Sequence, residues 1–290
     1  MGELVFVTAD EIAQAVSPLA AVEAIEAELR AGLDVAALPP RAAVPISNGE
    51  WLIMPAETST AVGIKALTVA PQNPARGLAR IQGLYILYDR DTLAPTAVLE
   101  ASSLTAIRTP AVSVAAIRPR LRDGMDALVF GNGPQALGHI ATLRAVVELG
   151  EVTQVTRSNP VADLPSALAK ADVIVCCTTA REPLFDSAPV RDDAILIAMG
   201  SHEAAARELD SAIMGRAQVV VEDAATALRE AGDVVFAVND GTLDPAALVN
   251  MSDTVNGRVP LATDRPVVFK STGMAWEDLV IAELAVRLGS

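Results

Sequence analysis

The stretch at residues 126–150, DALVFGNGPQALGHIATLRAVVELG, decides how the central part of the chain folds. It opens on an apolar run at residues 127–130, which is followed by the hexapeptide GNGPQA at residues 131–136. After this turn, apolar residues recur at the spacing of one helix face: Ala136, Ile140, Leu143 and Val147. Pro134 suits the first helical position and Gly150 suits the helix stop. The order strand, glycine turn, helix is the context that makes a dinucleotide-binding fingerprint credible.

GNGPQA places each small residue where a bound dinucleotide would need it. Gly131 allows the tight turn after the strand, and Gly133 lets the backbone approach a pyrophosphate. Ala136 keeps the helix close to the strand, while Pro134 and Gln135 lie at the helix start. The unpaired N–H groups of that first turn would face the phosphates. The alternative is a glycine turn that binds no ligand.

The length, composition and charge of the chain limit the classes of protein to which it can belong. A length of 290 residues suits about two domains. Apolar residues make up 51% of the chain but aromatic ones only 3%, so aliphatic side chains are expected to fill the core. The net charge of −14 argues against nucleic acid, whose phosphates require a basic surface. The sequence has no basic, apolar leader and no apolar run of about 18 residues, so we expect a soluble, cytoplasmic protein that does not enter a membrane.

Cysteine and histidine are too scarce for the usual disulfide or metal sites. The two cysteines, Cys176 and Cys177, are adjacent and cannot form an ordinary disulfide framework. We expect both to be buried strand residues, since no basic partner is nearby in sequence. The two histidines, His139 and His202, cannot form a histidine-rich metal site, and His139 is expected to be a packed helix residue. We therefore expect no metal.

The N-terminal part of the chain changes from helical to strand patterns. Thr8 and Glu11 form a capping-box pattern that predicts a helix start, and Ser17 with Pro18 predicts a second helix. Strands are predicted at residues 4–7, 42–46, 51–54, 61–69, 83–88 and 96–99, and a helix at 101–117. Few helical patterns interrupt the strands. This part is therefore predicted to be an α+β domain with a largely antiparallel or mixed sheet.

Beyond the fingerprint, short apolar runs alternate with helical patterns. Strands are predicted at residues 152–156, 172–178, 194–199 and 218–223, and helices at 161–170, 203–214 and 224–231. This alternation is typical of a parallel, doubly wound sheet. A last strand at 267–270 and a last helix at about 276–288 follow, and we expect that helix to pack on the N-terminal domain. The fold class is therefore α/β, with a Rossmann-type domain at residues 118–266 and an α+β domain formed by residues 1–117 and 267–290.

Segments spread in order along nearly the whole chain resemble the ornithine cyclodeaminase/μ-crystallin family. They comprise Pro40-Arg41, residues 51–55, Gly63-Ile-Lys65, Gln82-Gly83, LTAIRT at 104–109, GNGPQA, residues 171–184, MGSH at 199–202, RELD at 207–210 and STGMAWED at 271–278. No single motif is decisive, but the ordered series is specific. The resemblance implies a homodimer whose dimerisation and substrate domain is built from both chain ends, with a nicotinamide-binding domain inserted. Members reduce cyclic imino acids, interconvert amino and keto acids, cyclodeaminate ornithine or lysine, or act as small-molecule binding proteins.

The resemblance also implies that Arg41, Lys65 and Arg108 bind the carboxylate of the substrate. A small amino- or imino-acid anion needs fixed cations, and arginine offers bidentate geometry. Lys65 lies inside an apolar strand, where a solvated lysine would be poorly placed. Lys65, Arg108 and His202 are the candidate catalytic residues. The alternative for each of the three cations is a surface charge with an apolar stem.

The end of the second strand of the nucleotide fold bears on the choice of cofactor. NAD-binding enzymes place an acid there to bind the ribose hydroxyls, but this strand ends Thr156-Arg157-Ser158, without an acid. Arg157, with its two hydroxyl neighbours, could hold a 2′-phosphate, so we expect NADP(H) to be favoured over NAD(H). The alternative is a solvated turn arginine. The other cofactor-binding candidates, from the fingerprint and the resemblance, are Thr109, Gly131, Gly133, Pro134, Gln135, Thr178, Met199, Ser271 and Thr272.

His202 departs from the family pattern. Cyclodeaminases carry an aspartate at the matching position, where it acts on the substrate amino group, and an imidazole does a different job. The replacement argues against ornithine cyclodeamination, and His202 is either a proton donor to an imine nitrogen or a loop histidine. The expected function is NAD(P)H-dependent reduction of a cyclic ketimine carboxylate of the Δ1-pyrroline- or Δ1-piperideine-2-carboxylate type. The alternatives are an amino-acid dehydrogenase such as alanine dehydrogenase, an ornithine or lysine cyclodeaminase, and a non-catalytic binding protein.

Overall fold

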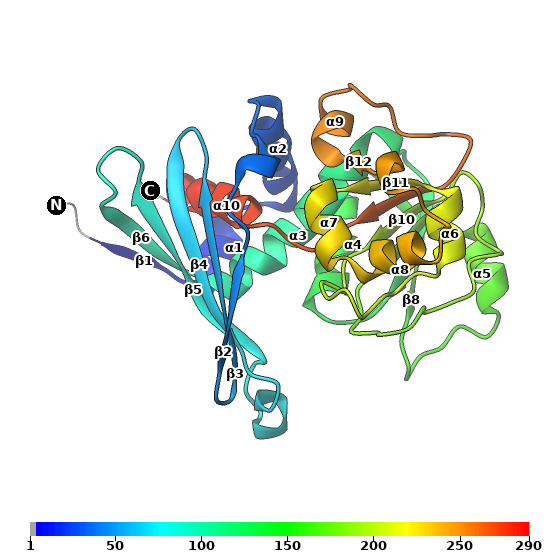
Figure 1. Cartoon of the computed structure of the whole chain (residues 1–290), viewed down its shortest axis with the longest axis horizontal. Helices are drawn as coiled ribbons and strands as arrows, with labels where there is room; N and C mark the ends of the chain where they lie inside the picture. Colours follow the sequence, from blue (N-terminus) through cyan, green and yellow to red (C-terminus); the bar gives the residue numbers. More distant parts are fainter. Residues whose placement is uncertain (1–3, 290) are drawn as a thin grey trace. The chain divides into compact units, whose positions relative to one another are not determined.

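The protein folds into two compact units in a computed structural model that describes residues 4–289 (Figure 1). The terminal unit runs to Thr109 and resumes at Met274, and the inserted unit spans Pro110–Gly273. Each unit has its own sheet. The α/β fold class predicted from the sequence is confirmed.

The terminal unit is built on a six-stranded sheet. Its strands are β1 (Val5–Val7), β2 (Ala42–Ile46), β3 (Gly49–Glu57), β4 (Ala61–Val69), β5 (Ile81–Asp89) and β6 (Pro95–Glu100). Their order is β1-β6-β5-β4-β3-β2, and neighbours are antiparallel except β1 and β6, which run parallel. The predicted antiparallel or mixed sheet is thus a mixed one.

Helices cover one face of this sheet. They are α1 (Ala9–Ala15), α2 (Pro18–Arg30) and α10 (Ala275–Gly289). The predicted capping box starts α1, where Glu11 Oε2 accepts from the Thr8 N–H at 2.8 Å. The last helix, α10, packs against α1, α2 and strands β3 to β5, as expected. Buried and partly exposed residues alternate along β4, so every second side chain, including Lys65, points into the core beneath these helices.

The inserted unit is built on a seven-stranded sheet in which all described neighbours are parallel. Its strands are β7 (Met125–Phe130), β8 (Leu149–Val155), β9 (Val173–Cys176), β10 (Ile195–Ala198), β11 (Gln218–Val221), β12 (Val249–Asn250) and β13 (Val267–Lys270). The order is β12-β11-β13-β10-β9-β7-β8. Strands β9, β10, β11 and β13 are buried along their whole length, as a sheet covered on both faces requires.

Most helices of the inserted unit alternate with its strands along the chain. They are α4 (Pro134–Val146), α5 (Leu164–Lys170), α6 (Ser211–Arg216), α7 (Ala224–Glu230), α8 (Gly232–Asn239) and α9 (Met251–Val255), while α3 (Ala101–Ile117) passes from one unit to the other at Thr109. Short 3-10 turns lie at Val35–Ala37, Asn73–Arg76, Arg118–Arg120 and Pro245–Ala247. Within residues 4–289, none of the helices has the length and apolar character needed to cross a bilayer.

Two predicted helix boundaries are wrong for local reasons. The helix predicted at 203–214 begins only at Ser211, because Asp210 caps it by accepting from the Ile213 N–H. The preceding loop is held away from helical geometry by Asp233, whose Oδ1 accepts from two consecutive backbone N–H groups, those of Glu208 and Leu209. Helix α4 ends at Val146, and the predicted stop residue, Gly150, lies in β8 instead.

The domain boundaries also differ from the predicted ones. Strand β13 lies between β10 and β11 and pairs with both in parallel register, with Val268 opposite Leu196 on one side and Val219 on the other. A strand with hydrogen-bonded neighbours on both sides cannot belong to a different domain, so residues 267–273 were assigned wrongly. The second half of α3, from Pro110, likewise belongs to the inserted unit.

Candidate active site

Parallel pairing brings many of the expected cofactor residues to one edge of the inserted sheet. Because all its strands run the same way, their carboxyl ends share that edge. The segments that leave the strands at this edge include Gly131, Thr156, Thr178, Met199 and Ser271. Strands β8 and β9 flank β7 on opposite sides, so the winding of the chain reverses there. Doubly wound sheets bind their ligands at such a reversal.

The turn between β7 and α4 has the space and the donors that a pyrophosphate requires. Gly131 has a φ of +120°, and a Cβ built there would lie 2.7 Å from the Cys177 carbonyl oxygen, so a side chain does not fit. Gly133 is the N-cap of α4, and this cap makes no side-chain hydrogen bond. A Cβ built on Gly133 would meet no described atom within 4 Å. The residues present therefore fit an anionic dinucleotide at this turn.

The end of β8 presents hydroxyl groups and one exposed arginine. Thr156 and Asn159 close a tight turn, with N–H to carbonyl distances of 3.1 and 3.2 Å. The Thr156 and Ser158 hydroxyls lie 3.1 Å apart. Between them, Arg157 is exposed, and the structure describes no ion pair for its side chain within residues 4–289. The tip of the turn thus carries a cation next to two hydroxyl groups.

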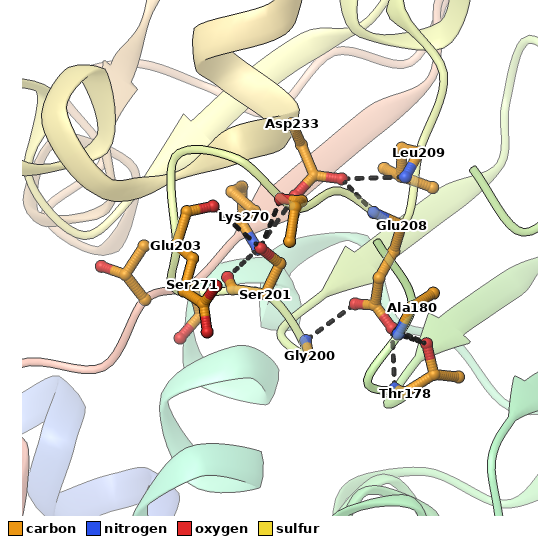
Figure 2. A network of polar contacts seen from close by, with 12 residues as sticks. Thr178, Ala180, Gly200, Ser201, Glu203, Glu208, Leu209, Asp233, Lys270 and Ser271 are labelled. Carbon is orange, nitrogen blue, oxygen red and sulfur yellow. Dashed lines mark hydrogen bonds and ion pairs between the residues drawn. The ribbon is translucent and has the colours of Figure 1, made fainter. Parts of the chain in front are cut away.

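A buried carboxylate, Glu208, ties two strand ends together (Figure 2). Its Oε1 accepts from both the N–H and the hydroxyl of Thr178 at 2.7 Å, and its Oε2 accepts from the Gly200 N–H at 2.7 Å. Burial raises the pKa of Glu208, although Lys270 and the Thr178 hydrogen bonds act in the opposite direction. Thr178, an expected cofactor residue, is therefore held in place by the inserted unit itself.

A buried ion pair near Glu208 holds the backbone at Ser201 (Figure 2). Lys270 Nζ lies 3.1 Å from Asp233 Oδ2 and donates to the Ser201 carbonyl at 2.6 Å. His202 follows Ser201 directly and is exposed. The sequence analysis missed Lys270 and Asp233. The available signal was a lysine that ends the apolar strand VVFK, which must find a partner once its strand is central.

Glu222 binds the segment after β13. Its carboxylate accepts from the Ser271 hydroxyl at 2.7 Å, from the Thr272 N–H at 2.8 Å and from the Gly273 N–H at 3.0 Å. Ser271 is buried, and Thr272 is half-buried. Both were expected at the cofactor. The structure places them at the correct sheet edge but with polar groups bound to Glu222, so their contact with a cofactor stays a prediction.

His139 is a packed helix residue, as predicted. It is buried, with Nδ1 2.8 Å from the Gln135 carbonyl oxygen and Nε2 2.9 Å from the Ser113 hydroxyl. Burial lowers the pKa of His139 to about 4, so its ring is neutral at pH 7. Burial also raises the pKa of Cys176 and Cys177. Thiols that stay protonated are poor nucleophiles. Cys176 is a buried residue of β9, as predicted, whereas Cys177 is half-buried and follows the strand, so the prediction for Cys177 was wrong.

The terminal unit contains a buried charge cluster formed by Lys65, Arg108, Glu277 and Asp278. Lys65 Nζ on β4 lies 2.5 Å from Asp278 Oδ2 on α10, and the two side chains are 1% and 0% exposed. Arg108 on α3 donates from Nη1 to Glu277 Oε2 at 2.7 Å, and its Nε lies 3.4 Å from Asp278 Oδ1. The structure thus brings together two of the three predicted carboxylate-binding cations, with Asp278 in contact with both.

Burial dominates the electrostatics of this cluster. It lowers the pKa of Lys65 to about 8, while the neighbouring Asp278 acts to raise it and Arg108 acts to lower it. Tyr85 is paired with Lys65 in the β4–β5 register and is also buried, which raises the pKa of its hydroxyl. A Cβ built on Gly63 would lie 2.2 Å from Tyr85 Oη, so glycine at this position makes room for the tyrosine.

Two further predicted residues lie in the terminal unit outside the described contacts of the cluster. Arg41 directly precedes β2 and is half-buried. Thr109 is buried, one residue after Arg108 on α3. The sequence analysis quoted Glu277 and Asp278 within a motif but assigned them no role. Acidic residues in the first turn of a helix are common there for electrostatic reasons, and this hides their use as partners of Lys65 and Arg108.

Comparison with known proteins identifies relatives over most of the chain. The model of the "Ornithine cyclodeaminase/mu-crystallin family" matches residues 3–163 and 159–287. A Delta(1)-pyrroline-2-carboxylate reductase of Bacillus thuringiensis is 32% identical over 84% of each chain, and the ketimine reductase mu-crystallin of Rattus norvegicus is 30% identical over 91% of this chain and 89% of its own. The structure of Thermococcus litoralis Delta(1)-pyrroline-2-carboxylate reductase in complex with NADH and L-proline superposes with a TM-score of 0.88, at 25% identity, over 98% of this chain and 97% of that one.

Proposed function

The chain belongs to the ornithine cyclodeaminase/μ-crystallin family, and on this premise we propose that it is a nicotinamide-dependent reductase of a cyclic ketimine carboxylate, of the Δ1-pyrroline- or Δ1-piperideine-2-carboxylate type. The reaction adds a hydride to the C=N carbon and a proton to the nitrogen, which gives a cyclic amino acid. The Bacillus thuringiensis and Thermococcus litoralis relatives are named for this activity, and the second was captured with NADH and L-proline.

The observation that carries the proposal is the burial of two cations, Lys65 and Arg108, against the same carboxylate of Asp278. In the proposed complex the substrate carboxylate lies against both cations, with Arg41 as a third. An anion bound by fixed charges in a buried site has one orientation, so its C=N group is presented in one direction. Positioning and charge complementarity then supply much of the rate.

The proton on the imine nitrogen comes from a titrating group or from the substrate itself. Lys65 has a pKa of about 8, so it is charged below that pH and can donate a proton near neutrality. His202 is exposed on the loop that follows Ser201 and is the second candidate donor. A substrate that enters already protonated needs neither, and the two cations then act by binding and orientation alone.

A bound nicotinamide cofactor supplies the hydride. In the proposal Gly131, Gly133 and the first turn of α4, with Pro134 and Gln135, hold its pyrophosphate. The other proposed contacts along its length are Thr109, Thr178, Met199, Ser271 and Thr272. Preference for NADP(H) over NAD(H) is proposed from the end of β8, where Thr156, Arg157 and Ser158 offer a cation and two hydroxyls and no carboxylate.

A homodimer is proposed from the outer face of the six-stranded sheet. Residues directly opposite one another share a face, so the pairings place Phe6, Val98, Ile86 and Ile64 in one row and Leu84, Ala66 and Ile53 in the next. Phe6, Leu84 and the neighbouring Trp51 are each roughly half exposed. Helix α10, with α1 and α2 packed against it, covers the opposite face. A second copy of the chain is the partner that would bury this apolar surface, and edge strands β1 and β2 would be protected with it.

A substrate panel tests the proposed function. Purified protein is mixed with reduced cofactor and, in turn, a cyclic ketimine carboxylate, pyruvate with ammonia, and, with oxidised cofactor, ornithine. The proposal expects cofactor oxidation with the cyclic ketimine to exceed that with pyruvate and ammonia. Ornithine-dependent ammonia release with stoichiometric proline would instead make the protein a cyclodeaminase. If the protein binds the cofactor but turns over none of these substrates, the result would favour a non-catalytic binding protein.

A further inference from the structure

The ammonium of Lys65 has three donors, and the structure accounts for two of them. One N–H reaches Asp278 Oδ2 at 2.5 Å, and a second is directed to Thr105 Oγ1 at 3.5 Å. The Thr105 hydroxyl donates its own proton to the Ala101 carbonyl at 2.9 Å, so toward Lys65 its oxygen acts as the acceptor. Within residues 4–289, Lys65 Nζ has these two hydrogen bonds, so its third N–H is available for a ligand.

Burial by itself would remove the charge that makes this donor useful to an anion. Lys65 is 1% exposed, and a lysine without a partner in such a place gives up its proton. The charged or titratable groups that face it are Asp278 and Glu277 from α10, Arg108 from α3 and Tyr85 from β5. Arg108 repels the ammonium, Tyr85 is neutral when protonated, and Glu277 Oε2 accepts from Arg108 Nη1. Asp278 is the group whose carboxylate directly contacts the ammonium.

We infer that Asp278 is a positioning residue for the proposed reaction: its carboxylate keeps Lys65 charged and fixed, so that the third N–H of the ammonium is offered to the substrate carboxylate. The inference rests on the proposed function for the identity of that ligand. Lys65 is then the cation that binds the substrate, and Asp278 is the partner that keeps it charged. It follows that the pair sets the alkaline limit of activity, because the anion-binding charge disappears when Lys65 loses its proton.

The protonation of Lys65 can be measured directly by NMR, because the chain has only three lysines: Lys65, Lys170 and Lys270. Lysine labelled with carbon-13 at Cε gives three NMR signals. The Lys65 signal is the one that disappears in the Lys65→Arg variant. Lys170 is exposed and serves as a reference. The midpoint of the Lys65 titration can be followed in the protein without substrate or cofactor. In the wild type it is expected near pH 8.

Asp278→Asn keeps the side-chain shape and removes the charge. The Lys65 midpoint should fall by about one to three pH units, the effect of an opposite charge at contact distance. The matched control is Glu277→Gln, which neutralises the adjacent acid of the same helix and should move the midpoint less. Asp233→Asn, which neutralises the partner of the other buried lysine, Lys270, should leave the Lys65 signal in place. A Lys65 midpoint that Asp278→Asn does not lower overturns the inference.

The pH profile of kcat/KM with a cyclic ketimine carboxylate is the second readout. The alkaline limb should move to lower pH in Asp278→Asn by the same amount as the NMR midpoint. Ionisation of the substrate is common to all variants and cannot produce this difference. A limb that stays in place while the NMR midpoint moves would overturn the role of the pair in the reaction.

Lys65→Arg keeps the inference testable if Asp278→Asn does not fold. A guanidinium does not titrate below about pH 12, so the alkaline limb assigned to Lys65 should disappear. An unchanged limb in Lys65→Arg would overturn the inference. Failure of the proposed function is distinguishable: the NMR titrations would behave as expected, but the wild-type protein would reduce no cyclic ketimine.

Discussion

Replacing Lys65 by methionine should lower the free energy of unfolding of the terminal unit, in addition to any effect on substrate binding. The ion pair joins Lys65 Nζ and Asp278 Oδ2 at 2.5 Å between side chains that are 1% and 0% exposed. Methionine keeps most of the stem volume, so little cavity is created. The loss arises because the Asp278 carboxylate stays buried, and its other described ionic contact, Arg108 Nε at 3.4 Å, is long. Breaking a buried pair in this way costs about 3–5 kcal/mol of unfolding free energy.

Tryptophan fluorescence during urea unfolding measures this loss selectively, because both tryptophans, Trp51 and Trp276, lie in the terminal unit. The control is the double variant Lys65→Met/Asp278→Leu, which removes both charges. It should recover most of the stability, since an apolar pair of similar volume can replace a buried ion pair at little cost. A Lys65→Met variant whose free energy of unfolding lies within about 1 kcal/mol of the wild type would show that the buried pair contributes little to stability. A double variant that is less stable than Lys65→Met would contradict the assignment of the loss to the unpaired Asp278 carboxylate.

Three further predictions address other parts of the molecule. Arg157→Ala should weaken NADPH binding about ten- to hundredfold in equilibrium titrations and leave NADH binding little changed, and an equal loss for both cofactors would assign Arg157 to loop support. Leu84→Asp places a charge on the outer sheet face and should convert a dimer to a monomer by light scattering, whereas a wild-type protein that is already a monomer would remove the proposed interface. Glu208→Gln leaves one of the N–H groups of Thr178 and Gly200 without an acceptor. It should weaken cofactor binding about tenfold, and unchanged affinity would limit Glu208 to a role remote from the cofactor.

Much of the inserted unit could be predicted because its signals are local. The fingerprint combines an apolar run, two glycines and a helical period within 25 residues, and the structure has β7, the turn and α4 in that order. Strand β13 shows what local signals cannot predict. Its residues, Val267–Lys270, were predicted as a strand, but their place between β10 and β11 depends on pairing with strands far back in the chain. Periodicity contains no information on such pairing.

The candidate site was predictable only in part, for the same physical reason. Lys65 and Arg108 were found through motifs, and the burial of Lys65 was suggested by its apolar strand. Their partners Glu277 and Asp278 follow more than a hundred and fifty residues later and look like ordinary acids at a helix start. Only the packing of α10 on β4 brings the opposite charges together. The role of Asp278 therefore had to come from the structure.

Reduction of a cyclic ketimine carboxylate by this protein can be followed atom by atom in the mass spectrum of the product formed with cofactor deuterated at nicotinamide C4. Each face of C4 is labelled in turn, and the product is analysed after one round of conversion. Hydride transfer to the C=N carbon gives a cyclic amino acid with a single deuterium on the carbon next to the carboxylate, from one of the two labelled cofactors. Product without deuterium from either cofactor, or no product at all, would contradict hydride transfer to the C=N carbon.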